Sequence, residues 1–123
     1  MRTPIIAGNW KMNKTVGEAV ELCRKLESAL QDSPVEVVVC PPFTALSAVF
    51  ALGLSKVKLG AQNMYLYDKG AYTGEISPVM LKDVGCQYVI LGHSERRQYF
   101  NEDDELVAAK AAKALEHGIR PII

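Results

Sequence analysis

Short apolar runs recur along the chain, and longer stretches with helical spacing separate them. Two of these runs are Val37-Val38-Val39 and Val89-Ile90-Leu91. A strand that is apolar on both faces is typical of a parallel sheet under helices, because both faces must then be buried. Strands that alternate with helices predict an α/β architecture, either an open parallel sheet or a barrel. This alternation constrains the fold more than any other feature of the sequence.

Apolar spacing and turn residues predict four strand-helix units and the start of a fifth strand. The expected strands cover residues 5–10, 36–40, 57–62, 88–91 and 120–123. The first helix is expected to begin after Thr15, because Glu18 completes a capping box. The second is expected after Pro41-Pro42 with Thr44 as its cap, and the third has Ser77 as its cap. The last helix is expected to end at His117.

Length and charge limit the classes of function. The 123 residues are enough for one domain, and 14 basic residues balance 14 acidic ones. Without net positive charge or a basic run, neither nucleic acid nor a membrane surface is an expected partner. The first residues lead directly into a strand and lack the apolar region of a signal peptide, so a cytoplasmic location is expected.

Neither the cysteines nor the acidic residues indicate a metal centre. Cys23, Cys40 and Cys86 lack C-x-x-C spacing and are expected to be buried structural thiols. The acidic run at 102–105 is expected to stabilise the start of a helix through the macrodipole. No metal or other cofactor is therefore expected.

Polar clusters follow the first and fourth expected strands. One is Gly8-Asn9-Trp10-Lys11-Met12-Asn13 and the other is Gly92-His93-Ser94-Glu95-Arg96-Arg97. The carboxyl ends of parallel strands meet on one rim, so a lysine, an amide and a histidine are expected to converge there on a small anion. Lys11 could instead be a surface lysine paired with Glu95, and His93 a structural histidine under a loop.

The segment 63–75 is too long for an ordinary connection between a strand and a helix. It contains three tyrosines and a methionine, which are enriched in the cores of protein interfaces. An interface with another protein is therefore expected, and the alternative is a loop folded over its own helices.

Four strings in the sequence resemble the triosephosphate isomerase family in order and spacing. They are Gly8-Asn9-Trp10-Lys11-Met12-Asn13, Gly60-Ala61-Gln62-Asn63, Tyr72-Thr73-Gly74-Glu75-Ile76-Ser77 and Gly92-His93-Ser94-Glu95-Arg96-Arg97. The resemblance runs from about Thr3 to the last residue and implies the family's eight-stranded β/α barrel. Such barrels take about 250 residues, so the chain is expected to form an amino-terminal half-barrel, a single partial domain over 1–123.

The resemblance also implies an activity, the interconversion of dihydroxyacetone phosphate and glyceraldehyde 3-phosphate through an enediolate. By this resemblance Asn9 and Lys11 hold the phosphorylated three-carbon sugar, and a neutral His93 polarises its carbonyl group. Glu95 supports the site beside Lys11 and is not the general base, which in the family follows the sixth strand. The 123 residues alone are therefore expected to be inactive or nearly so.

The resemblance further implies a homodimer. Its interface is expected to include Met12, Asn13, Thr73, Gly74 and Glu75, with Thr73 reaching the partner's site. An alternative is a half-barrel that associates with itself, or with a missing carboxyl-terminal half, because an open parallel sheet leaves unpaired edges. Such a chain would be an assembly unit without catalysis.

Overall fold

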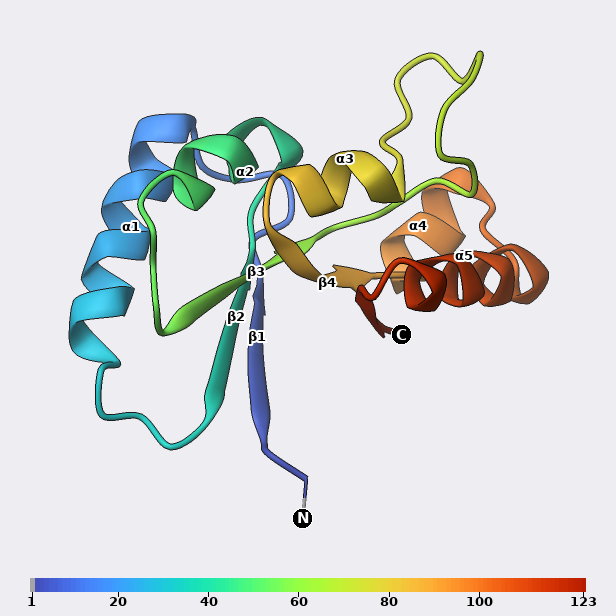
Figure 1. The fold of residues 1–123 in the computed structure, drawn as a ribbon. Coiled ribbons are helices and arrows are strands. Elements are labelled where there is room, and N and C mark those ends of the chain that lie inside the picture. Colours follow the sequence, from blue (N-terminus) through green and yellow to red (C-terminus); the bar gives the residue numbers. More distant parts are fainter. Residues whose placement is uncertain (1) are drawn as a thin grey trace.

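The structure, a computed structural model, describes residues 2–123 as five parallel strands that alternate with helices (Figure 1). The elements are β1 (Ile5–Asn9), α1 (Val16–Ala29), β2 (Glu36–Cys40), α2 (Phe43–Phe50), β3 (Val57–Ala61), α3 (Pro78–Asp83), β4 (Cys86–Ile90), α4 (Ser94–Phe100), α5 (Asp104–Glu116) and β5 (Arg120–Ile122). Each strand pairs with the next along the chain, in the order β1-β2-β3-β4-β5. This half-barrel of four β/α units and a fifth strand confirms the predicted fold class.

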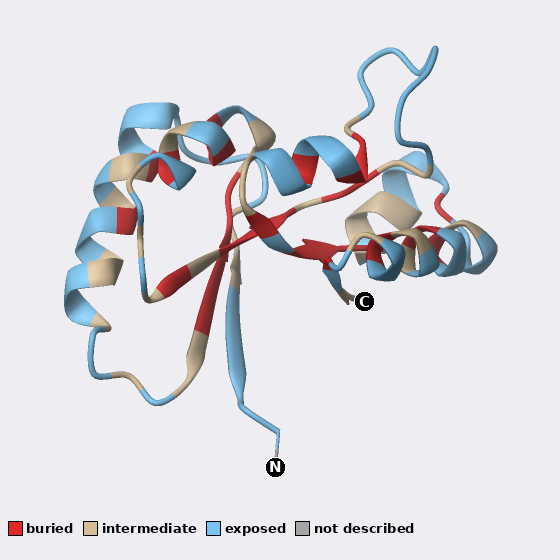
Figure 2. Cartoon of the chain, in the orientation of Figure 1, coloured by how far each residue is buried: buried red, intermediate tan, exposed pale blue. Residues whose placement is uncertain are grey.

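The helices cover one face of the sheet, and the main hydrophobic core lies between them and the strands. Figure 2 shows the buried positions concentrated along β2, β3 and β4. A smaller cluster on the sheet's other face contains Val38, Cys40, Tyr88 and Ile90. Within residues 2–123, none of the helices combines the length and the apolar character needed to cross a membrane.

Both edges of the sheet are open in the part of the chain that the structure describes. β1 pairs only with β2, and β5 pairs only with β4. The Ile6 side chain on β1 is also exposed, with 61% of its residue surface accessible. An exposed edge strand offers unpaired backbone groups to another strand.

Two of the three predicted helix caps are confirmed. Thr15 and Glu18 form the capping box at the start of α1, and the Ser77 side chain accepts a hydrogen bond from the Met80 amide. Thr44 was the wrong cap for α2. Extended Pro42 is the residue before the helix, and its carbonyl already accepts a bond from the Ala45 amide at 3.0 Å. Thr44 therefore lies inside the first turn.

Strand ends also differ from the predicted ones by one or two residues. Trp10, Gln62, Leu91 and Ile123 lie just beyond β1, β3, β4 and β5, and β4 begins earlier, at Cys86. The Trp10 and Leu91 amides still donate to the Cys40 and Ile122 carbonyls, so pairing with the neighbouring strand continues one residue past the ends of β1 and β4. Gln62 therefore follows β3 at the rim of the sheet, where its side chain makes the hydrogen bonds described below.

The three cysteines are free and buried, as predicted. Burial raises the pKa of Cys23 to about 11, and burial also raises the pKa of Cys40 and of Cys86 to about 12. Their thiols therefore stay protonated near neutral pH and are poor nucleophiles.

The acidic run before α5 has structural roles. Asp103 is the N-cap and accepts a hydrogen bond from the Leu106 amide at 2.8 Å, while Asp104 and Glu105 occupy the first turn. Glu102 departs from the prediction, because it precedes the helix and is buried in an ion-pair network described below. Among residues 2–123, no three His, Cys, Asp or Glu side chains are grouped closely enough to hold a metal ion.

The Glu27 carboxylate joins the end of α1 to the loop that enters β3. It accepts hydrogen bonds from the amides of Ser55 at 3.0 Å, Lys56 at 2.7 Å and Val57 at 2.9 Å. Partial burial raises the pKa of Glu27, but the amide donors outweigh it and the net pKa is lowered. The ionised form of Glu27 is thus more stable in the folded chain than in the unfolded one.

We expect Glu27→Gln to lower the free energy of unfolding by about 1–2 kcal/mol at pH 7, because charge-assisted bonds are replaced by weaker ones. A lowered carboxyl pKa contributes stability above the unfolded value, and this contribution is lost as the pH falls through the folded value. The difference between variant and wild type should therefore shrink toward pH 3 in urea titrations.

The matched control is Glu21→Gln, which removes only an exposed pair with Lys25 on the same helix. Such a pair contributes less than about 0.5 kcal/mol. An equal loss for Glu27→Gln at pH 3 and pH 7 would contradict the pH dependence.

Candidate active site

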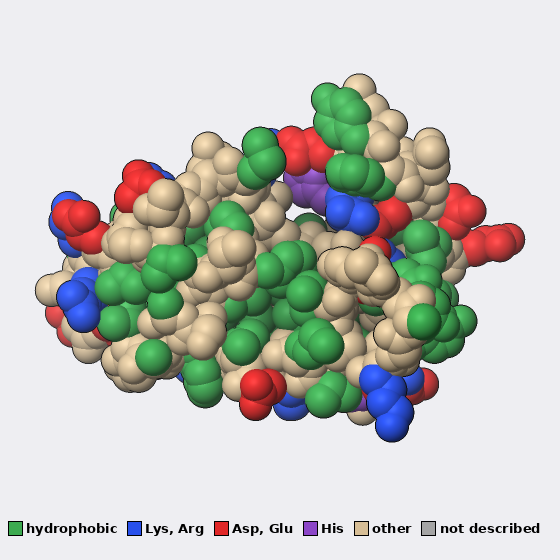
Figure 3. All heavy atoms as spheres, turned by 90° about the horizontal axis from the view of Figure 1, so that it is seen from above, with side chains coloured by type: hydrophobic (Ala, Val, Ile, Leu, Met, Phe, Trp, Pro, Cys, Tyr) green, Lys and Arg blue, Asp and Glu red, His purple; other side chains and the backbone are tan. Residues whose placement is uncertain are grey.

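Residues at and after the carboxyl ends of β1 to β4, together with α4, line a hollow of about 390 Å³. Figure 3 looks down on the molecule and shows histidine, basic and acidic side chains gathered beside a hollow. The hollow is lined by Asn9, Lys11, Met12, Phe43, Gln62, Asn63, His93, Glu95, Arg96, Tyr99 and Phe100. The structure thus brings the two polar clusters of the sequence together, as the parallel strands predicted.

The backbone at Lys11 is held in a left-handed conformation, with φ of 55°. Its amide donates to Asn9 Oδ1 at 2.9 Å, and its carbonyl accepts from Gln62 Nε2 at 2.9 Å. Gln62 Nε2 also donates to the Cys40 carbonyl at 2.8 Å. Gln62 therefore connects the ends of three strands, a role that the sequence analysis missed.

The ammonium group of Lys11 and the Glu95 carboxylate form an ion pair at 2.7 Å. Both side chains are about half exposed. The hydrogen bond from Lys11 is the main cause that lowers the pKa of Glu95, which therefore remains ionised at neutral pH. The ion pair considered as an alternative for Lys11 is present, and it lies inside the hollow.

His93 is the N-cap of α4, and its ring is oriented by the helix that it starts. Nδ1 accepts a hydrogen bond from the Glu95 amide at 3.1 Å. An acceptor nitrogen carries no proton, so this contact selects the neutral ring with its proton on Nε2. His93 is thus arranged as a hydrogen-bond donor through Nε2.

Gly92 makes the close approach of this turn to α5 possible. Its φ is 65°, and a β-carbon there would lie 2.7 Å from the Val107 side chain. Arg97 Nε donates to the Gly92 carbonyl at 2.8 Å, and its guanidinium pairs with Asp104 at 2.6 Å. The turn that carries His93 is therefore tied to the start of α5.

A buried ion-pair network connects α4 to α5 through Glu102. Glu102 Oε2 accepts from Arg96 Nε at 2.6 Å and from Lys110 Nζ at 2.9 Å. Lys110 Nζ also donates to Asn63 Oδ1 at 2.9 Å, which connects the network to the end of β3. Burial of Glu102 raises its pKa, but the two cations outweigh this effect and lower the net pKa. Removing Glu102 would leave the buried Lys110 ammonium group without an ionic partner.

The loop 63–75 projects from the body of the molecule (Figure 1). The rings of Tyr65, Tyr67 and Tyr72 pack on one another, with centroids 4.9–5.7 Å apart. At its end Thr73, Gly74 and Glu75 are exposed. The tyrosines therefore give the loop an internal framework, and its exposed end is available to another molecule.

Two predicted interface residues come from the turn after β1. Met12 is 96% exposed, and the Asn13 amide group donates to the Trp10 carbonyl at 2.9 Å. Met12 also lines the hollow, so a partner bound at this turn would lie next to Lys11.

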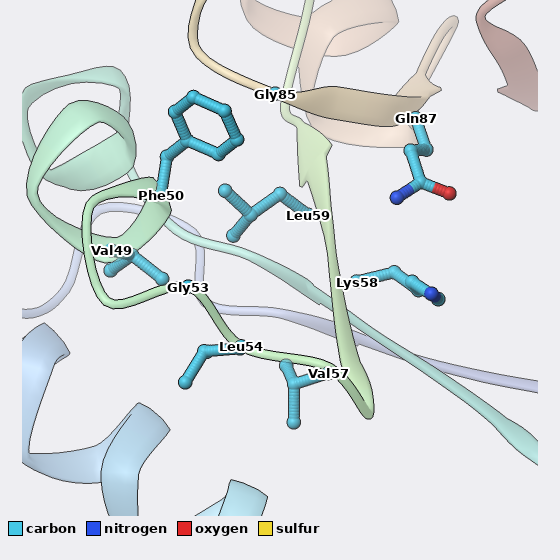
Figure 4. Close-up of a pocket in the computed structure, with 9 residues that line it drawn as sticks. All are labelled: Val49, Phe50, Gly53, Leu54, Val57, Lys58, Leu59, Gly85 and Gln87. Atoms are coloured by element: carbon cyan, nitrogen blue, oxygen red, sulfur yellow. The ribbon is translucent and has the colours of Figure 1, made fainter.

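A second, smaller hollow lies between α2 and the strands β3 and β4 (Figure 4). Its volume is about 90 Å³ and its lining is mainly apolar, with Lys58 and Gln87 as polar members. It lacks the convergent polar groups found at the rim, so it is not the candidate active site.

The fold and the site together define a β/α-barrel protein with its polar groups at the carboxyl ends of the strands, where enzymes of this class carry their active sites. The sequence profile of the family described as triosephosphate isomerase matches residues 4–123. The chain belongs to the triosephosphate isomerase family.

Similar proteins agree with this assignment. Triosephosphate isomerase of Alkaliphilus metalliredigens is 60% identical over all of this chain and 50% of its own length. That of Chloroflexus aurantiacus is 61% identical, again over 100% of this chain and 50% of its own length. The crystal structure of the Bartonella henselae enzyme has a TM-score of 0.88 at 42% identity, over 98% of this chain and 50% of that chain. The chain spans about half the length of the curated relatives it matches.

We expect Lys11→Met to raise the pKa of Glu95 toward the ordinary carboxyl value, because the donor that stabilises the carboxylate is lost. A carbon-detected NMR titration of the glutamate side chains would measure it. Lys14→Met is the matched control, because Lys14 acts on Glu18 instead. An unchanged Glu95 titration in Lys11→Met would show that the ion pair does not form in solution.

Proposed function

We propose that this chain supplies the substrate-binding and carbonyl-polarising part of an enzyme that interconverts dihydroxyacetone phosphate and glyceraldehyde 3-phosphate. The observation that carries the proposal is the convergence of a lysine ammonium group and a neutral histidine on one hollow. Membership in the triosephosphate isomerase family supports the choice of substrate.

Lys11 and Asn9 bind the substrate in this proposal. The Lys11 ammonium group is a compact cation that attracts a phosphorylated sugar. Asn9 uses Oδ1 to accept the Lys11 amide, which leaves its amide nitrogen to donate to a substrate oxygen. The side chains of Asn9 and Gln62 bond to the Lys11 backbone and hold it in place before substrate binds.

His93 polarises the substrate carbonyl. When a base removes the proton from the neighbouring carbon, the electron pair moves into the new carbon-carbon double bond and negative charge develops on the carbonyl oxygen. Nε2–H of a neutral imidazole donates to that oxygen and stabilises the enediolate. A proton then moves from the neighbouring hydroxyl oxygen to the former carbonyl oxygen, and return of the carbon-bound proton to the other carbon gives the isomeric sugar.

Glu95 is not the base of this reaction in our proposal, because the hydrogen bond from Lys11 lowers the pKa of its carboxyl group and makes it a weak base. We infer that the base and the groups that exclude water come from a part of the enzyme outside residues 1–123, as in the family that the chain resembles. The 123 residues alone then lack the general base, whose proton transfer contributes roughly 10²–10⁴-fold to the rate. They are therefore expected to have little or no isomerase activity.

The test is a chimera that joins residues 1–123 to the second half of the Alkaliphilus metalliredigens relative. We expect the chimera to interconvert the two triose phosphates in a coupled assay. His93→Gln should lower kcat by roughly 10²–10³-fold, the usual loss for an oxyanion donor. Lys11→Met should raise KM by roughly tenfold or more, because a charge-assisted contact is lost.

Lys14→Met is the control for the loss of a nearby positive charge and should leave both constants unchanged. Normal turnover in the His93→Gln chimera would contradict the electrophilic role. Full activity of residues 1–123 without the second half would contradict the assignment of the base.

We also propose that the loop 63–75 contacts a second copy of the chain. The exposed Thr73, Gly74 and Glu75 form its contact end, and Met12 and Asn13 form the receiving turn beside the hollow. The framework of stacked tyrosines supports this proposal, because a preorganised loop loses little conformational freedom on binding.

A second candidate function is that of a half-barrel that assembles through its open edges without catalysis. The exposed β1 edge favours it, because Ile6 and the unpaired backbone groups can pair with another strand. This candidate concerns residues 1–123 on their own.

Sedimentation velocity on residues 1–123 would test the second candidate. If β1 drives association, Ile6→Lys should shift the chain to monomer, because a lysine on an edge strand opposes pairing. Leu115→Lys is the matched control on α5, where the replaced leucine is also exposed. Association that survives Ile6→Lys would exclude pairing through this edge.

A further inference from the structure

Asp68 and His117 connect the projecting loop to the body of the molecule. Asp68 lies within the loop 63–75, and His117 is the residue that ends α5. Asp68 Oδ1 is 3.1 Å from Nε2 of His117 and 3.5 Å from Nζ of Lys113. The loop is thus held against α5 at Asp68, which is not one of the residues of its proposed contact end.

Both ring nitrogens of His117 face acceptors. Nδ1 lies 3.1 Å from the Lys113 carbonyl oxygen, and a carbonyl can only accept a hydrogen bond. Nδ1 therefore carries the proton of a neutral ring, and Nε2 would then present a lone pair to the Asp68 carboxylate. Only the doubly protonated imidazolium donates to both groups. The geometry at His117 therefore offers an acceptor to each nitrogen of an imidazolium.

The other charges around His117 come from three elements. On α5, Lys113 is repulsive toward an imidazolium, but it is paired with Asp68 and with Glu116 at 3.6 Å. The carboxyl end of α5 itself favours a cation. From α3, the Lys82 ammonium lies beside Gly118, 3.7 Å from where a β-carbon would be. Asp68 is the loop's carboxylate in direct contact with the ring.

We propose that Asp68 and His117 form a clasp that closes when His117 takes up a proton and then fixes the orientation of the loop 63–75. The clasp holds the whole loop, because the tyrosine stack and the bond from the Tyr65 amide to the Ile76 carbonyl, at 2.8 Å, make the loop one compact unit. Asp68 and His117 are positioning residues for the contact with a second copy. This step rests on the proposed function of the loop.

Hydrogen exchange of the loop amides between pH 7.5 and 5.5, corrected for the intrinsic rates, tests the clasp in the 123-residue chain. Histidine takes up its proton in this range, whereas carboxylates remain ionised. Protection of the loop amides should rise roughly two- to five-fold toward pH 5.5, as for a partly exposed ion pair. Asp68→Asn and His117→Gln should each abolish the rise, and the double variant should add nothing further.

Two further variants assign the effect. His117→Lys keeps a positive charge at every pH tested, so its loop protection should no longer depend on pH. His93→Gln removes the other histidine of the chain, and the rise should persist in this variant. A wild-type loop without the rise, or a rise that persists in Asp68→Asn, would overturn the clasp.

Sedimentation of the same samples separates the clasp from the proposed function of the loop. Tighter association at pH 5.5 that disappears in Asp68→Asn supports both. A chain that stays monomeric at each pH while its loop protection rises supports the clasp and overturns the interface. Association without any change in loop protection overturns the clasp alone.

Discussion

Hydrogen bonding between neighbouring parallel strands is the constraint on which the rest of this structure depends. Each strand pairs with the next in the chain, so every strand ends on the same rim and every helix returns over the same face. Side chains that follow different strands therefore meet without any long connection. The site is a consequence of this order, because Asn9 and Lys11 come from the end of β1 and His93 from the end of β4.

The sequence predicted the strands well where burial dominates. Val37-Val38-Val39 lies within β2, and its apolar character on both faces required a covered sheet. Prediction of local hydrogen bonding was less reliable, as at Thr44, because the hydroxyl group fits a cap but Pro42 already ends the extended segment two residues earlier. Capping depends on where the chain stops being extended, and the sequence locates that point only within a residue or two.

Within the candidate site, the sequence predicted which polar residues share the rim but not how they are held. The ion pair of Lys11 with Glu95 was foreseeable from the two polar clusters. Gln62 was not, because its partners are backbone carbonyls from two other strands. The burial of Glu102 was equally hidden, since it depends on cations from α4 and α5 that converge only in three dimensions. Roles that depend on distant backbone atoms leave no local pattern.

The left-handed backbone at Lys11 means that backbone conformation and side-chain charge make opposite demands on one residue. A non-glycine residue in this conformation costs roughly 1–2 kcal/mol, and glycine would adopt it without that cost. Glycine, however, has no charge to place in the hollow. A change to glycine at this position would therefore relax the backbone and at the same time remove the ion pair with Glu95.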